Sequence, residues 1–412
     1  MKKIRIVFLY RGLSFWLNNH SLYKECLWDG NFDIWVVPES NSIDLEILQM
    51  LKNDKVHIIE KNIKDEKYFD LKRLNPDYVL IATPYKSQRN KIYNSEYLSK
   101  FTKVLYIPYG PYVYNNYNKS YLLNGELINC YKIFLNSTEE IENFSKYLNK
   151  NNLLLSSHPI YDLFYTNKYI KDFNLNKKIW NFEKSNDKKR ILWTPHWTIE
   201  SWEYLDNFKE KKGNSDFTKY ADLWLRIPKM YPNLDIIMRP HPNLFTQLPK
   251  ESKVEWNSEG IKKWKQEFEK NNNAKIDNNS NYIEQFLSSD AFINSSLSFT
   301  NLLINTLKPI LSVRNISESS ELNMHTSNIE KSYYIANNEQ DIIDFLDNIV
   351  FKGKDIMLEN RKKALKENIH IPDVGVGYFI KEYLIHDYFY GENTIKNSNI
   401  IKNLYRKIYG TK

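Results

Sequence analysis

The chain has 412 residues, which is too long for one ordinary hydrophobic core and is typical of two domains. Apolar residues make up 42% and charged residues 26%, and this balance excludes an intrinsically disordered protein. The formal net charge of +8 suits anionic partners such as phosphates, acidic polymers or lipid headgroups. It does not single out nucleic acid, and we predict no nucleic-acid partner.

Cysteine usage and hydropathy bound the compartment. Cys26 and Cys130 lie far apart without metal-ligand spacing, so we expect neither a disulfide framework nor a zinc site, and we predict a cytoplasmic protein. No stretch approaches the roughly 18 apolar residues that span a bilayer, so we do not expect an integral membrane protein. The first apolar run, at 4–10, is too short for a signal-peptide core and is interpreted as a buried strand.

The first half of the chain alternates short apolar runs with helical patterns. This alternation is typical of βαβ units that build a parallel sheet. The predicted strands are 4–10, 32–37, 78–82, 104–107 and 132–135.

A polar segment at 169–189 separates this half from a second sheet-forming region. The predicted strands there are 190–194, 235–238 and 291–294, with helices at 217–230, 281–288 and 298–306. We therefore predict two doubly wound α/β domains, at 1–170 and at 190–385. Such domains bind ligands at the carboxyl ends of their strands, so we expect a shared central cleft lined by strand-end loops.

The C-terminal segment 386–412 is predicted to be a basic helix, because it mixes Ile, Leu and Tyr with Lys and Arg. Two interpretations stay open for it: a helix that crosses back to the N-terminal domain, and a helix that faces a membrane surface. No GxGxxG follows a strand and no GxxxxGK[ST] occurs, so dinucleotide oxidoreductases and P-loop NTPases lose their main support.

The first candidate loop follows the strand at 190–194 and carries Thr194, His196 and Thr198. A histidine at a strand's carboxyl end can donate a hydrogen bond to phosphate or take a proton near neutral pH. The structural alternative is that His196 simply packs between Trp193 and Trp197.

The second candidate loop places Arg239 and His241 directly after the strand at 235–238, in a turn stiffened by two prolines. Arginine offers a planar fork of donors to phosphate, and His241 adds a titratable partner. A rigid cationic loop at a strand end favours a ligand over a structural role.

The third candidate loop follows the strand at 291–294 and carries Ser295, Ser296 and Ser298 before a helix. These hydroxyls can cap the helix and leave its free N–H groups directed at an anion. Helix capping without a ligand is the alternative interpretation.

In the first domain, the strand at 104–107 ends in a loop with Tyr109, Gly110 and Tyr112. Gly110 lets a ligand approach the backbone closely, and an aromatic hinge loop is the alternative. His158 and Asp162, near the domain junction, are further candidates for acceptor binding, with a structural turn as the alternative.

With these motifs in place, residues 100–315 resemble the CDP-glycerol glycerophosphotransferase family, the teichoic-acid polymerase and primase group of GT-B enzymes. The resemblance is carried by the segments Leu192-Trp-Thr-Pro-His-Trp197, Arg239-Pro-His-Pro242, His158-Pro-Ile-Tyr-Asp162, Ser289-Asp290 with Ser295-Ser296, and Lys308-Pro309. It implies a GT-B fold of two Rossmann-like domains, an acceptor-side domain at 1–170 and a nucleotide-donor domain at 190–385. It also implies that His241, Ser295 and Ser296 hold the pyrophosphate of the donor.

Two positions depart from the pattern of that family. The family has a His-Gly pair that supplies the catalytic base where this chain has Tyr109-Gly110, and an Asp-Tyr-Ser-Ser segment where this chain has Ile293-Asn-Ser-Ser296. Tyrosine, with a reference pKa near 10, is a poor base at neutral pH. His196 and Asp162 are therefore alternative bases.

The leading hypothesis is a transferase that moves glycerol phosphate or ribitol phosphate from a CDP-linked donor to an acceptor hydroxyl and releases CMP. Its acceptor would be a polysaccharide or lipid-linked polymer of the capsule or cell surface, with peripheral contact at the inner face of the membrane. We assign catalysis to His241, His196 and Tyr109, expect no cofactor, and expect no metal because cationic residues can neutralise the diphosphate. The alternatives are a GT-B glycosyltransferase that uses a nucleotide sugar and a non-catalytic polysaccharide-binding protein.

Overall fold

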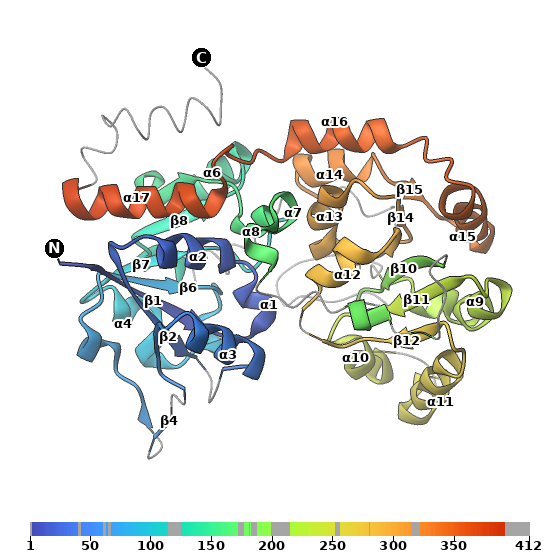
Figure 1. The fold of residues 1–412 in the computed structure, drawn as a ribbon, viewed down its shortest axis with the longest axis horizontal. Coiled ribbons are helices and arrows are strands. Elements are labelled where there is room, and N and C mark those ends of the chain that lie inside the picture. Colours follow the sequence, from blue (N-terminus) through green and yellow to red (C-terminus); the bar gives the residue numbers. More distant parts are fainter. Residues whose placement is uncertain are drawn as a thin grey trace. The chain divides into compact units, whose positions relative to one another are not determined.

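The computed structural model describes residues 2–39, 43–60, 63–64, 67–113, 125–171, 177–180, 182, 188–198, 215–251, 256–279, 281–314 and 322–391. The chain forms two compact units (Figure 1). Unit 1 comprises residues 1–112, 116–174 and 369–412, and unit 2 comprises residues 113–115 and 175–368.

Unit 1 is built on a seven-stranded parallel sheet in the order β3-β2-β1-β6-β7-β8-β9 among the described residues. Strand β1 lies inside this sheet, between β2 and β6, and is buried on both faces, as its nearly continuous apolar sequence requires. A separate antiparallel pair, β4 and β5, follows β3. The strands are β1 (Ile4–Tyr10), β2 (Phe32–Pro38), β3 (His57–Ile58), β4 (Ile63–Lys64), β5 (Lys67–Tyr68), β6 (Tyr78–Ile81), β7 (Lys103–Tyr106), β8 (Lys132–Leu135) and β9 (Leu153–Leu155).

Short helices connect these strands, and the longest helix of unit 1 comes from the far end of the chain. The helices are α1 (Leu13–Trp16), α2 (His20–Trp28), α3 (Leu45–Asn53), α4 (Ser95–Leu98), α6 (Thr138–Ser145), α7 (Asp162–Tyr165), α8 (Asn167–Ile170) and α17 (Val376–Tyr390). Single 3-10 turns lie at Leu71–Leu74, Lys86–Gln88, Lys91–Tyr93, Leu127–Asn129, Lys150–Asn152 and Pro159–Tyr161.

Unit 2 repeats the same plan on a six-stranded parallel sheet in the order β12-β11-β10-β13-β14-β15 within its described residues. In both units the strand order reverses beside the first strand, which is the topology of a doubly wound dinucleotide-type fold. The strands are β10 (Lys189–Thr194), β11 (Leu234–Met238), β12 (Ala274–Ile276), β13 (Ala291–Asn294), β14 (Ile310–Ser312) and β15 (Tyr334–Ile335).

The helices of unit 2 alternate with its strands. Several begin with side-chain caps: Asn257, Asn323 and Asn338 each accept a backbone N–H of the first turn of a helix. The helices are α9 (Phe217–Met230), α10 (Leu244–Glu251), α11 (Ser258–Glu269), α12 (Ile283–Ser288), α13 (Leu297–Leu303), α14 (Met324–Glu330), α15 (Glu339–Asp344) and α16 (Leu358–Asn368), with 3-10 turns at Lys177–Trp180 and Ile304–Thr306 and a π-helical stretch at Phe345–Phe351.

Aromatic packing fixes the core of unit 2 beneath the strand that carries the first candidate loop. Trp193 of β10 is fully buried and stacks on Trp224 of α9, with ring centroids 4.3 Å apart. Trp264 of α11 packs edge-on against Trp193. These large rings hold β10, α9 and α11 together, so the carboxyl end of β10 has a rigid base.

The predicted fold class is confirmed, and every predicted strand lies within a residue or two of an observed one. The second unit, however, ends earlier than the predicted range 190–385, because the chain returns to unit 1 at Ile369.

Buried hydrogen bonds and a close helix approach hold the returning helix α17 on unit 1. The buried carboxylate of Asp162 accepts the backbone N–H groups of Val376 and Gly377, at 2.9 and 2.8 Å, at the start of the helix. Asp387, near its end, accepts hydrogen bonds from the hydroxyls of Tyr78 and Tyr131. Gly377 lets α17 approach α2 closely, because a Cβ there would lie 2.5 Å from the backbone carbon of Ser21 (Figure 1).

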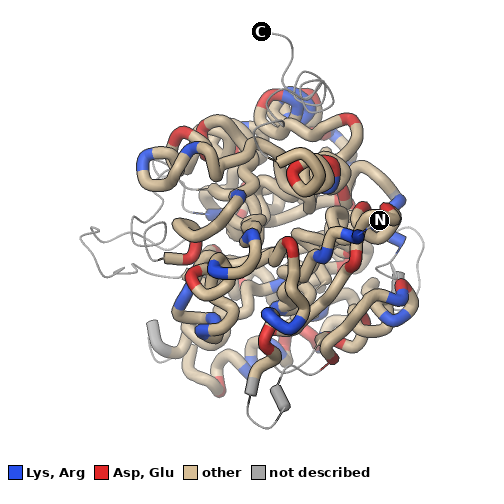
Figure 2. The backbone as a smooth tube through the Cα atoms, turned by 90° about the vertical axis from the view of Figure 1, so that its left-hand side faces the viewer, with Lys and Arg blue, Asp and Glu red and all other residues tan. Residues whose placement is uncertain are grey.

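Residues 392–412, which make up most of the predicted C-terminal basic helix, lie outside the described residues. No described helix is both long and apolar enough to cross a membrane. Figure 2 shows Lys and Arg positions interspersed with Asp and Glu positions along the backbone.

Candidate functional site

The candidate site of unit 2 lies where the strand order reverses. β10 pairs with β13 on one side and with β11 on the other, so their carboxyl ends share one edge of the sheet. The three loops predicted from the sequence follow these three strands. Parallel sheets bind ligands outside this edge, at the point where the strand order reverses.

Hydrogen bonds join the loop after β10 to the loops on both sides. The backbone N–H of His241 donates to the carbonyl oxygen of Pro195 at 3.1 Å. On the other side, the backbone N–H of His196 donates to Oγ of Ser295 at 2.9 Å, and the Thr194 hydroxyl donates to Oδ1 of Asn294 at 2.7 Å. The sheet ladder thus continues beyond the strand ends and fixes the three loops as one surface.

The imidazoles of His196 and His241 lie side by side on this surface, with ring centroids 5.5 Å apart. Nδ1 of His241 accepts the backbone N–H of Asn243 at 3.1 Å. Nδ1 of His196 lies 2.8 Å from the Thr198 hydroxyl and 3.3 Å from the Thr198 backbone nitrogen. Because Nδ1 accepts in both rings, the proton of each neutral ring is on Nε2, which is a hydrogen-bond donor.

Burial keeps both imidazoles neutral. It lowers the pKa of His196 from the ordinary value near 6.5 to about 3, with a further contribution from the neighbouring His241. Burial alone lowers the pKa of His241 to about 4. At neutral pH the two rings therefore present two N–H donors and no positive charge.

The serines of the third loop differ in what they contact. Ser296 is buried and Ser298 is exposed, and their hydroxyl oxygens lie 3.1 Å apart. The backbone N–H of Ser296 donates to Oδ1 of Asn294 at 3.0 Å. The amide oxygen of Asn294 thus accepts from both Thr194 and Ser296 without adding a negative charge.

Ser295 is tied to a residue that the sequence did not single out. Its hydroxyl donates to Oδ1 of Asp216 at 2.5 Å, while Oδ2 of Asp216 accepts the indole N–H of Trp193 at 2.8 Å. Asp216 is 1% exposed. An aspartate before an apolar helical pattern reads as a helix cap in the sequence, and nothing in the pattern indicates a contact with Ser295.

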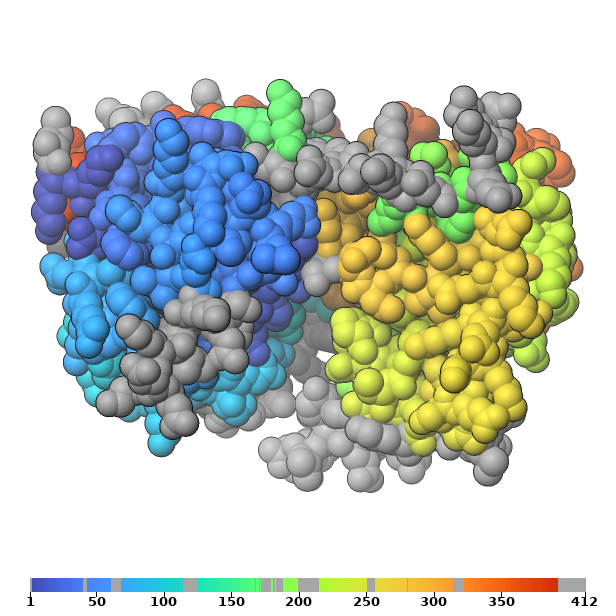
Figure 3. All heavy atoms as spheres, turned by 60° about the horizontal axis from the view of Figure 1, so that its bottom comes forward, coloured from blue at the N-terminus to red at the C-terminus, as the bar shows by residue number. Residues whose placement is uncertain are grey.

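The guanidinium of Arg239 is engaged within unit 2. Nη1 lies 3.2 Å from Asp277 and 3.1 Å from the Gln285 side chain, and Nη2 donates to the carbonyl oxygen of Asn279. The guanidinium carbon Cζ of Arg239 lies 5.7 Å from the ring centroid of Tyr282. These contacts give Arg239 a structural role at the end of β11 in place of the predicted free phosphate fork. The same loop leads into α10, which with α11 forms the yellow surface in Figure 3.

In unit 1, the predicted loop residues differ in exposure: Tyr109 is exposed, whereas Tyr112 is half-buried. Tyr109 is 40% exposed, and its hydroxyl lies 3.0 Å from the hydroxyl of Tyr85. A Cβ built on Gly110 would meet nothing within 4 Å. Tyr112 instead packs on Phe144 in the core of unit 1, so its contacts are structural rather than those predicted for ligand binding.

His158 and Asp162 are buried, at 1% and 2% exposure. Nε2 of His158 donates to the carbonyl oxygen of Pro108 at 2.9 Å, and Nδ1 accepts the backbone N–H of Ile160 at 3.2 Å. Burial lowers the pKa of His158 to about 4 and raises the pKa of Asp162 to about 6. Both side chains are occupied by structural contacts, which leaves neither placed to bind an acceptor or to act as its base.

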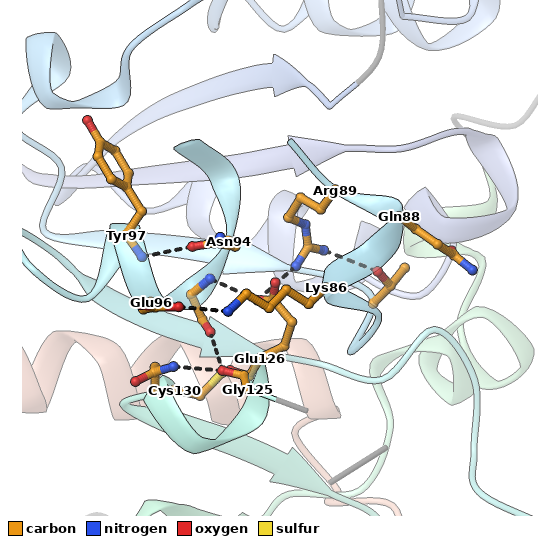
Figure 4. Close-up of polar contacts among 12 residues, drawn as sticks. Lys86, Gln88, Arg89, Asn94, Glu96, Tyr97, Gly125, Glu126 and Cys130 are labelled. Carbon is orange, nitrogen blue, oxygen red and sulfur yellow. Dashed lines mark hydrogen bonds and ion pairs between the residues drawn. The ribbon is translucent and has the colours of Figure 1, made fainter. Parts of the chain in front are cut away.

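A buried polar cluster in unit 1 was also not predicted from the sequence. The buried guanidinium of Arg89 lies 3.0 Å from Glu39 and 3.3 Å from Glu126, and Arg11 lies 3.2 Å from Glu39 on its other side (Figure 4 shows the Arg89 and Glu126 side chains). The backbone N–H of Ser95 donates to Glu126. These residues are scattered between 11 and 126, so sequence spacing does not reveal them.

Within the described residues, no three His, Cys, Asp or Glu side chains come together as metal ligands do. Lys308, part of the family resemblance, lies against the end of α12, where its ammonium donates to the carbonyl oxygens of Phe286 and Leu287. Burial lowers the pKa of this lysine to about 8.

No protein-family model matches the chain, and no curated protein matches it. Solved structures do match. A UDP-GlcNAc 2-epimerase from Neisseria meningitidis, bound to UDP-GlcNAc, aligns with a TM-score of 0.58 at 13% identity over 93% of this chain and 99% of that chain. The wall teichoic acid polymerase TagF aligns with a TM-score of 0.61 at 12% identity over 93% of this chain and 89% of that chain.

A glycosyltransferase from Rickettsia africae aligns with a TM-score of 0.51 at 14% identity, over 95% of this chain and 100% of that chain. At these identities the likeness concerns the fold and not the reaction. Together with the two doubly wound parallel sheets, it shows that the chain has the GT-B fold.

Proposed function

We propose that the chain is a transferase that moves an alditol phosphate from a CDP-linked donor to an acceptor hydroxyl. One observation carries the proposal: three loops at the strand reversal of unit 2 are hydrogen-bonded to one another, and together they carry the neighbouring rings of His196 and His241 and the hydroxyls of Ser296 and Ser298. Such a group of neutral donors suits the oxygens of a diphosphate.

In this reaction the acceptor oxygen bonds to the β-phosphorus of the donor. The bond from that phosphorus to the bridging oxygen breaks, and CMP leaves with the bridging oxygen. His196 and His241 would donate to the phosphate oxygens as charge moves toward CMP. Because their protons are on Nε2, these rings act as donors, and the proton of the acceptor hydroxyl passes to another group or to water.

The comparisons support this donor class without assigning it. TagF is described as a wall teichoic acid polymerase, and one of its structures was soaked with CDPG. The motif resemblance points the same way. We accordingly propose a polysaccharide or lipid-linked polymer of the cell surface as the acceptor, reached at the inner face of the membrane.

A second candidate function is transfer of a sugar from a nucleotide sugar. It is favoured by Tyr109, whose hydroxyl pairs with Tyr85 at the position where the resembling family has its catalytic histidine. Among the similar folds, one structure is bound to UDP-GlcNAc and another is a co-structure with UDP. The same donor surface would then hold the diphosphate of a UDP-sugar.

The test is a ligand and product screen with the purified full chain. We expect CDP-glycerol or CDP-ribitol to raise the melting temperature and to release CMP when a polyol phosphate acceptor is added. Release of a nucleoside diphosphate from a UDP- or GDP-sugar would assign the second function instead. If no nucleotide changes the melting temperature or is turned over, both proposals fail and a polysaccharide-binding protein becomes the better hypothesis.

A further inference from the structure

The position of Asp216 is unusual for a residue that directly precedes a helix. It stands at the N-cap of α9, yet its side chain makes no capping hydrogen bond there. Its two carboxylate oxygens instead accept from the Ser295 hydroxyl and from the Trp193 indole, and the side chain is 1% exposed. A buried carboxylate that makes no capping hydrogen bond needs other partners, and here these are Ser295 and Trp193.

The hydrogen bond to Asp216 determines which other hydrogen bonds Ser295 can make. Because the Ser295 hydroxyl hydrogen is donated to Asp216, Ser295 has no hydrogen left for a phosphate oxygen. Its oxygen accepts the backbone N–H of His196 at 2.9 Å. Ser295 is therefore a link between two loops, and the donors left for an anion on this side are one hydroxyl of the Ser296–Ser298 pair and the ring of His196.

We propose that Asp216 is a positioning residue of the donor site, which through Ser295 holds the loop of His196 against the loop of Ser296. The inference rests on the proposed function for the ligand that the site takes. The geometry that it explains, however, exists without any ligand. Trp193 completes the arrangement, because its indole holds the second oxygen of Asp216 and is itself fixed by stacking on Trp224.

The charge on Asp216 makes this arrangement sensitive to pH. Burial raises the pKa of Asp216 to about 6, while the hydrogen bonds from Ser295 and Trp193 and the charge of Lys219 act in the opposite direction. Above that pH the carboxylate accepts strongly from Ser295. Below it the carboxyl is neutral, and its hold on the hydroxyl weakens.

The first experiment measures hydrogen exchange of the His196 backbone amide in the full chain without ligand. Asp216→Ala and Ser295→Ala should each speed this exchange at least tenfold, because either change removes the same link. The double variant should exchange no faster than the single ones. Asp235→Ala is the matched control, since Asp235 is also buried in unit 2 but pairs with Lys188 at the start of β11. Unchanged exchange in Ser295→Ala, which removes only the hydroxyl group, would overturn the positioning role.

The second experiment measures CMP binding by calorimetry from pH 5 to pH 8. We expect at least tenfold weaker binding in both single variants, a wild-type affinity that falls below pH 6, and a flatter pH profile in Asp216→Asn. Faster exchange combined with unchanged CMP affinity would overturn the proposal. A wild type that binds no nucleotide would instead remove the proposed function, while the exchange measurement would still report whether Asp216 positions the loop.

Discussion

The chain uses one local turn in both units, with different outcomes. His158 in unit 1 and His241 in unit 2 each precede a proline, and each accepts through Nδ1 the backbone N–H two residues ahead. In unit 1 the second ring nitrogen donates to the carbonyl oxygen of Pro108. In the described part of unit 2, no hydrogen bond is found for Nε2 of His241.

The difference teaches that the turn itself carries no function. The turn fixes the tautomer of the ring, and the surroundings then decide whether Nε2–H holds the fold together or stays available to a ligand. Burial lowers the pKa of both rings to about 4, so an altered pKa alone does not separate a functional histidine from a structural one.

The largest expected effect is on turnover. His241→Ala should lower turnover about 100- to 1000-fold, because it removes a donor to the developing charge on the donor phosphates. The melting temperature should change little, since this ring is only half buried. The matched control is His57→Ala, at an exposed ring in β3. Near-normal turnover in His241→Ala would contradict the functional role that distinguishes His241 from His158.

The opposite pattern is expected for His158. His158→Ala should lower the free energy of unfolding by about 2 to 4 kcal/mol, because the carbonyl of Pro108 and the N–H of Ile160 lose buried partners. Turnover per folded molecule should stay within a few fold of the wild type. Urea unfolding followed by activity measured at low temperature checks both, and a selective loss of activity without loss of stability would contradict the structural role.

The pH response gives a third test. The pKa of His158 is depressed in the folded state, so its contribution to stability is present above pH 6.5 and is lost as the pH falls through about 4. His158→Gln should therefore lose less stability than the wild type over this window, as measured by urea unfolding at each pH.

Proton NMR of the ring signals sharpens the same comparison. Added CMP should raise the pKa of His241 by about one unit, because a nearby anion favours the charged ring, and should leave His158 unchanged. An equal shift in both rings would indicate a general effect rather than a site in unit 2.

The smallest effect is expected at Tyr109. Tyr109→Phe removes the contact with the Tyr85 hydroxyl at an exposed position and should change turnover by less than about threefold. Tyr85→Phe is the matched control, since it removes the other half of the same pair. A loss of about 100-fold in Tyr109→Phe alone would assign chemistry to this hydroxyl and favour unit 1 as the source of the catalytic base.

The fold was predictable because buried parallel strands appear as continuous apolar runs that end in loops. β1, β8 and β13 were located to the residue by this pattern. The three candidate loops of unit 2 were also predictable, since neighbouring parallel strands bring their carboxyl ends together. The strand order, which places β10 between β11 and β13, cannot be predicted from any local segment of the sequence.

Tertiary structure alone decided the roles of the charged and titratable side chains. The sequence predicts that Arg239 binds phosphate. The structure shows that its guanidinium is held by Asp277 and Gln285, about 40 residues away in sequence. The sequence offers Asp162 as a base. The structure shows that its carboxylate accepts the backbone N–H of Val376 at the start of α17, 214 residues away in sequence. Local sequence sets backbone conformation through short-range sterics, whereas the availability of a polar group depends on partners that only folding brings near.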